Sequence, residues 1–151
     1  SMKTVVFKVG KNEVYQEVAK TTSYTGAKMD NDENAYDRIF TTDEDKTMLE
    51  RFWNESKNMI AGSLKKLLSS EREENNEYIL ELEVSNSFDD NLKESMQRSL
   101  FSFFVMNITS KWYIFTNKNE AEGYATSAAT DMEDVMRKAY YKKKPVRPTY
   151  D

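Results

Sequence analysis

Residues 92–115 read LKESMQRSLFSFFVMNITSKWYIF, and this stretch decides the fold. Its apolar side chains recur at spacings of three and four residues, which predicts a helix. Around residues 100–108 they occupy more than one face. Such a helix lies at the centre of a protein, or it packs against a neighbouring subunit as well as its own core. The stretch therefore predicts a central helix, begun near Ser87, and is a hint of oligomerisation.

Two further long helices are predicted on either side of this one in the sequence. Thr41 and Glu44 fit a capping box, and an apolar stripe follows from Met48 to Leu68. After a break at 117–119, a return helix runs from about Glu120. Its small residues would let it lie close against the central helix as an antiparallel hairpin. These are Ala121, Gly123, Ala125, Ala128 and Ala129.

The remaining segments predict a small β component. Thr4–Val9 is β-branched and ends at a glycine, and Tyr78–Val84 alternates, so both are expected to be strands. A short helix starting near Asn12 is expected between the first strand and a turn at 23–26. The charged residues 71–77 read as a loop.

We therefore expect one domain over residues 1–151, mainly α with a small β component: a hairpin or bundle of three long helices plus two or three short strands. Only four glycines and two prolines interrupt the chain, which favours helices. The expected parts are an N-terminal strand and helix (3–22), a polar loop (23–40), a helical core with one strand (41–141, strand 78–84) and a basic C-terminal arm (142–151).

The chain contains no histidine and no cysteine. This composition excludes Ser–His and Cys–His catalysis, imidazole and thiolate metal sites and disulfides. The stretch 30–34 resembles the start of a calcium loop, but Ala35 stands where that loop needs glycine. Glu81 and Glu83 share a strand face, which on an alternating strand is normally the solvated one. We expect no enzyme, no metal, no cofactor, no small-molecule substrate and no membrane segment.

Charge is distributed unevenly along the chain. The net charge is −4, yet residues 30–50 are strongly acidic and residues 137–147 carry cations without an acid. Such asymmetry suits head-to-tail contact between copies or contact with an acidic partner, while a solvated face and a frayed tail remain the simpler interpretation. The candidate contact residues are Arg137, Lys138, Tyr140, Tyr141, Lys142, Lys143, Lys144 and Arg147 on the basic side, and Asp43, Glu44 and Asp45 on the acidic side.

The layout of helices and tail, with three local stretches, carries a resemblance to a known group of proteins. The stretches are EVAKTTSYTGAK (17–28), YDRIFTTDED (36–45) and YYKKKPVRP (140–148). They resemble the head–tail connector adaptor and ring proteins of tailed bacteriophages, in particular gut phages of the crAss-like kind. The resemblance implies a virion protein, assembled in the host cytoplasm, that forms a ring-like homo-oligomer beside other virion proteins such as a portal.

A nucleic-acid-binding or regulatory module is the alternative. The tyrosines and lysines of the C-terminal arm could stack on bases and neutralise phosphates, giving DNA contact. An enzyme that uses carboxylates alone is the third hypothesis, and it requires a buried carboxylate with a raised pKa.

Overall fold

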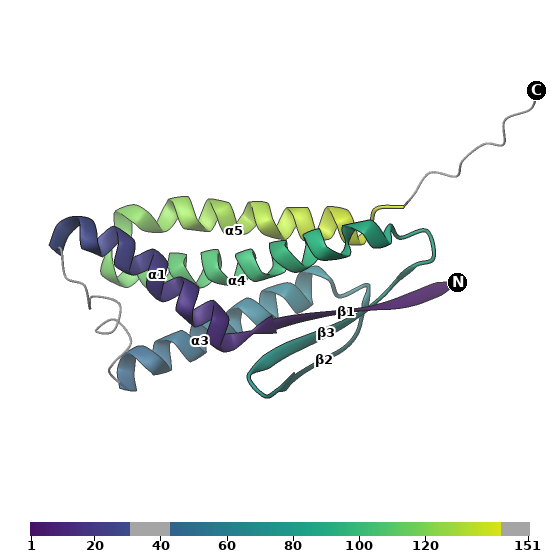
Figure 1. The fold of residues 1–151 in the computed structure, drawn as a ribbon, viewed down its shortest axis with the longest axis horizontal. Coiled ribbons are helices and arrows are strands. Elements are labelled where there is room, and N and C mark those ends of the chain that lie inside the picture. Colours follow the sequence, from purple (N-terminus) through teal and green to yellow (C-terminus); the bar gives the residue numbers. More distant parts are fainter. Residues whose placement is uncertain (31–42, 143–151) are drawn as a thin grey trace, which may run out of the picture.

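The computed structural model describes residues 1–30 and 43–142, the backbone alone for 23–30 and 43. Within these ranges the chain is mainly helical with one small sheet, as the sequence predicts (Figure 1). The elements in chain order are β1 (Met2–Gly10), α1 (Lys11–Asp30), α3 (Asp43–Ser63), β2 (Leu68–Glu74), β3 (Glu77–Ser85), a 3₁₀ turn η1 (Asp90–Leu92), α4 (Lys93–Thr116) and α5 (Lys118–Ala139).

The sheet has three antiparallel strands in the order β1-β3-β2. Both predicted strands are confirmed, and each extends beyond its predicted bounds. Val5, Phe7 and Val9 of β1 pair with Leu82, Leu80 and Tyr78 of β3, and all six side chains are buried. These residues form the inner face of the sheet because alternate side chains on paired strands point to the same side.

The prediction of a loop at 71–77 is wrong, because residues 68–74 form strand β2. A two-residue turn connects β2 to β3, and both its residues have positive φ, 52° at Asn75 and 62° at Asn76. That conformation belongs to the type I′ turn, whose twist matches paired strands, and asparagine adopts it readily. The helix predicted to carry an apolar stripe from Met48 to Leu68 is α3, and it ends earlier than predicted, at Ser63. An exposed edge strand carries charged side chains without loss of stability, so its sequence resembles that of a loop.

The first helix is longer than predicted. α1 continues through the expected turn at 23–26 and ends at Asp30, so that turn and the first part of the expected 23–40 loop are wrong. Val14, Val18 and Thr22 are all buried on one face. The described residues thus contain four helices of 20 or more residues instead of three. The predicted capping residue Thr41 lies outside the described residues.

Helix α4 lies at the centre, between α5 on one side and the sheet with α1 and α3 on the other (Figure 1). This position explains its apolar side chains on several faces without a neighbouring subunit. The turn η1, capped by the Asp89 carboxylate, precedes it, so the helix starts later than the predicted Ser87. α5 returns antiparallel to α4, as predicted, through the break at Asn117.

The close contact of α5 with α4 uses fewer of the small residues than predicted. Ala121 and Ala128 are buried against α4, together with the larger Met132 and Val135. Gly123, Ala125 and Ala129 are exposed, so their expected role in helix packing is wrong. The buried positions lie at helical spacing on one face, and Gly123 lies on the opposite face.

Candidate functional site

The two predicted cations inside α5 are engaged within the chain. Arg137 and Lys138 reach the Asp134 carboxylate at 2.6 and 2.7 Å, and Lys138 also contacts the Ser95 hydroxyl of α4. Burial raises the pKa of Asp134, but hydrogen bonds from Lys138 and Ser99 outweigh it and hold the pKa below its ordinary value. Lys138 therefore helps hold α5 against α4, which reduces its availability to a partner.

The side chains that follow α5 are directed to solvent. Tyr140 and Tyr141 are 43% and 48% exposed, and Lys142 is exposed beside a β-bridge that its backbone makes with Phe88. Lys143, Lys144 and Arg147 lie outside the described residues. Tyr140, Tyr141 and Lys142 are called the basic end below.

The predicted acidic residues lie at the opposite end of the molecule. Asp43 begins α3, Glu44 is exposed and Asp45 is half-buried. Figure 1 shows the start of α3 and the end of α5 at opposite ends of the long axis. Among the residues that the structure describes, the predicted acidic and basic residues are therefore not brought together within one copy.

Exposed apolar side chains accompany the acidic residues. Ile114 and Phe115, in the last turn of α4, are 53% and 63% exposed. The Phe115 ring stacks on Phe52 of α3 with centroids 6.3 Å apart and planes 13° from parallel. Glu44, Asp45, Ile114 and Phe115 are called the acidic end below.

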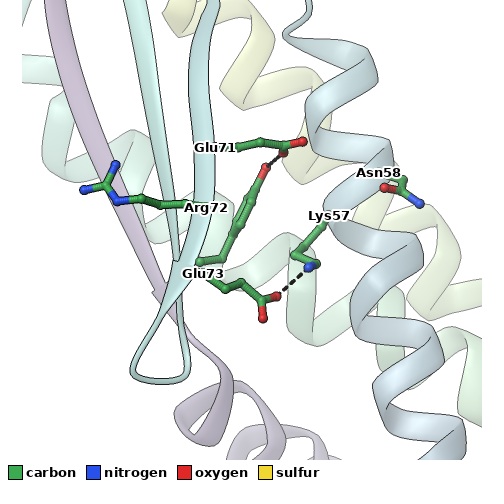
Figure 2. Close-up of a pocket in the computed structure, with 6 residues that line it drawn as sticks. Lys57, Asn58, Glu71, Arg72 and Glu73 are labelled. Carbon is green, nitrogen blue, oxygen red and sulfur yellow. Dashed lines mark hydrogen bonds and ion pairs between the residues drawn. The ribbon is translucent and has the colours of Figure 1, made fainter.

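A pocket that the sequence did not predict opens between α3 and β2 (Figure 2). It has a volume of about 260 Å³ and is lined by Lys57, Asn58, Glu71, Arg72, Glu73 and Tyr78. Glu71 and Glu73 alternate with Arg72 along β2, so both glutamates face α3 whereas Arg72 points away from it. Reading 71–77 as a loop gave these glutamates no common face, and so the pocket was missed.

Hydrogen bonds tie the pocket glutamates to aromatic side chains. Glu73 accepts from the buried Trp53 indole at 2.6 Å and pairs with Lys57 at 2.5 Å. Glu71 accepts from the Tyr78 hydroxyl at 2.5 Å. Burial raises the pKa of Glu73, but the hydrogen bonds from Lys57 and Trp53 outweigh it, so that pKa lies below its ordinary value. Burial raises the pKa of Tyr78, and the hydrogen bond to Glu71 raises that pKa further. These contacts fix the edge strand against α3.

The other candidate sites are not assembled. Glu81 lies on the outer face of the sheet, where it accepts from Ser70 and Arg72, and Glu83 on the same face is exposed. In the described ranges, 1–30 and 43–142, no three acidic side chains cluster as a metal site requires. The calcium-like stretch 30–34 falls, apart from Asp30, outside them.

Comparison with known proteins adds no relative. Scans of family models, curated proteins and solved structures find no match to this chain. Among the described residues, no helix has the length and apolar character that crossing a bilayer demands.

Proposed function

We propose that the chain is a non-enzymatic structural subunit that assembles head to tail with copies of itself, as a connector or ring protein of a phage virion would beside its portal. The resemblance in sequence supports the virion setting. The observation that carries the proposal is the separation of the acidic end from the basic end along the long axis (Figure 1).

The two ends are complementary in chemistry. The acidic end combines the exposed Glu44 with two exposed apolar side chains, Ile114 and Phe115. The basic end combines two exposed tyrosines with Lys142. Opposite charges select the partner surface, whereas burial of aromatic area supplies most of the affinity. Because the ends are different surfaces, the contact is heterologous, and repeating it closes a ring if the rotation between copies allows.

Light scattering during size exclusion tests this proposal with a charge exchange. Glu44→Lys with Asp45→Lys makes the acidic end basic, and Lys142→Glu with Lys143→Glu and Lys144→Glu makes the arm acidic. We expect the native chain to form a discrete oligomer that weakens at high salt. Each variant alone should be monomeric, and an equimolar mixture of the two should regain the oligomer, because every contact then joins opposite charges.

Two outcomes contradict the proposal. One is a native chain that stays monomeric at low salt and high concentration. The other is an oligomer that neither variant disturbs. Ser127→Lys is the control for an added cation, since Ser127 is exposed near the middle of α5, away from both ends, and the change should leave the mass unchanged.

DNA binding is the second candidate, favoured by the exposure of Tyr140 and Tyr141 beside Lys142. Aromatic rings stack on bases of any sequence while lysines neutralise phosphate. A fluorescence titration with single-stranded DNA separates the candidates. A DNA-binding module retains its affinity in the Glu44→Lys, Asp45→Lys variant and loses it in the arm variant, whereas a self-assembling subunit shows no salt-dependent DNA binding.

A further inference from the structure

The two edges of the sheet differ in how their backbone groups are satisfied. On the β1 edge, the Gln97 side chain of α4 accepts from the Lys8 amide at 3.1 Å and donates to the Lys8 carbonyl. A side-chain amide thus occupies the position that another strand would take. The β1 edge is therefore closed at Lys8 to an added strand.

The hydrogen-bond alternation identifies the groups that face outward on the β2 edge. In the two-residue hairpin, Glu74 and Glu77 form the hydrogen-bonded pair nearest the turn. The amides and carbonyls of Glu73 and Glu71 consequently point away from β3. The other side of the sheet gives the same result. The amide and carbonyl of Lys8 point away from β3, so the amide and carbonyl of its partner Ile79 point toward β2. Within the part of the chain that the structure describes, no hydrogen bond occupies these outward groups of Glu71 and Glu73.

A helix runs beside this open edge, and the pocket of about 260 Å³ lies between them (Figure 2). Every residue of β2 after Leu68 is exposed. A sheet edge flanked by a helix is the arrangement in which proteins bind an extended peptide as an added strand: the backbone supplies affinity and the pocket selects alternate side chains.

The charges on β2 indicate which strand fits. Glu71 and Glu73 flank the outward backbone groups on the pocket side. Glu73 already pairs with Lys57 and accepts from Trp53, whereas among the described residues only Tyr78 contacts the Glu71 carboxylate, so Glu71 is the main acceptor for a guest cation. A second copy of β2 fits poorly, because a two-fold pairing centred on residue 71, 72 or 73 sets like charges directly opposite each other. Lysine or arginine side chains on a guest strand would face the glutamates instead.

We propose that the β2 edge and its pocket bind an extended segment of a partner protein as an antiparallel fourth strand, with lysine or arginine at alternate residues. In an antiparallel pair, guest residues bonded to Glu71 and Glu73 direct their side chains to the same face as those glutamates. The basic residues of the guest therefore also provide the backbone groups that bond to the edge. This site shares no residue with the two ends used for self-assembly and is independent of that proposal.

The probe is a hexapeptide with a fluorescent label at its N-terminus, fluorescein-Lys-Val-Lys-Val-Lys-Val-amide, and the full chain is titrated into it. We expect saturable binding, and no binding of the analogue with glutamate in place of lysine. Two N-methylated analogues test strand addition, since a methyl group removes an amide donor without changing charge. Methylation of the lysine amides should abolish binding, and methylation of the valine amides should leave it unchanged, because those amides face solvent.

Variants of the protein locate the site. Glu71→Gln removes one charge and should weaken binding about tenfold. Glu71→Pro deletes an amide that faces outward, so the ladder to β3 survives and the guest is lost. Glu133→Gln, a distant charge removal, should change nothing. The proposal is overturned if no peptide binds, if the two methylated peptides bind equally, or if Glu71→Gln binds as tightly as the native chain.

Discussion

Trp53 shows how a single residue joins the apolar and polar parts of this fold. Its side chain is fully buried, with ring centroids 4.7 Å from Phe104 and 6.3 Å from Tyr15. Its indole nitrogen nevertheless donates to Glu73 at the edge of the sheet. A buried donor without an acceptor costs about 1–3 kcal/mol, and the Glu73 carboxylate removes this cost for Trp53.

Thr109 presents the opposite case and gives a prediction at this scale. Its side chain is fully buried, and its hydroxyl has no hydrogen-bond partner within the described residues. We expect Thr109→Val to keep the shape, remove the unsatisfied group and raise the free energy of unfolding by about 1 kcal/mol. The melting temperature should rise by about 2–4 °C, measured by circular dichroism.

Thr116→Val is the control for this change. The Thr116 hydroxyl donates to the Trp112 carbonyl at 3.1 Å on the same helix, so its removal should bring no gain. A loss of stability in Thr109→Val, equal to that in the control, would show that the buried hydroxyl is satisfied in solution.

At the scale of elements, polar contacts fix how α4 and α5 lie against each other. Ser99 and Ser102 of α4 donate to Asp134 and Asp131 of α5, at 2.6 and 2.5 Å, and Ser110 donates to the Ala121 carbonyl. The two aspartates differ electrostatically. Lys138 and Arg137 stabilise the charge of Asp134, whereas burial, and then the charge of Asp134, raise the pKa of Asp131.

The raised pKa of Asp131 gives a prediction of pH dependence. The folded chain binds this proton more readily than the unfolded chain, so ionised Asp131 costs stability at neutral pH and the cost disappears as the pH falls through the folded pKa. We expect Asp131→Asn to melt higher than the native protein at pH 7, with the difference vanishing below about pH 4.

Asp134→Asn should behave in the opposite way. The folded pKa of Asp134 is lowered, so its charge contributes stability above the unfolded pKa, and this contribution is lost as the pH falls through the folded pKa. Melting curves of both variants over the acid range check the pair. If the melting temperatures of the two variants, relative to the native protein, changed with pH in the same direction, the assigned pKa shifts of Asp131 and Asp134 would be contradicted.

At the scale of the whole molecule, helix α4 joins two layers that share one core. Phe104 is fully buried and lies within ring contact of Trp53 of α3, Tyr78 of β3 and Phe103 of α4. The side chains between α4 and the sheet are thus continuous with those between α4 and the other helices. Loss of packing at this point affects both layers together.

Phe104→Ala is therefore expected to destabilise the entire fold. The lost contacts and the remaining cavity should cost about 3–5 kcal/mol, a large part of the ~5–15 kcal/mol typical of a domain. Urea titrations followed by tryptophan fluorescence and by far-ultraviolet circular dichroism should shift together. Phe115→Ala, at an exposed ring, should cost about 1 kcal/mol or less. Separate transitions for the two probes would show that the layers unfold independently.

The sequence by itself determined the class of the fold and the elements whose side chains report their own burial. The β-branched run in 4–9 and the alternation in 78–84 predicted β1 and β3, and the dense apolar spacing of 92–115 predicted the central helix. Each of these elements buries side chains in a regular period, and a period is readable without knowing the partner.

Only the tertiary structure decided the elements whose partners lie far along the chain. β2 became a strand because β3 pairs with it and because a sheet edge accepts charged residues, although its own residues suggest a loop. α1 continues past its expected end to Asp30, and Thr22 at that expected end is buried and accepts from the Tyr113 hydroxyl of α4 through its carbonyl, a contact made across 91 residues of the chain. The separation of the acidic and basic ends, and the pocket between α3 and β2, likewise exist only once the elements pack, since charge and spacing along a chain do not fix distance in space.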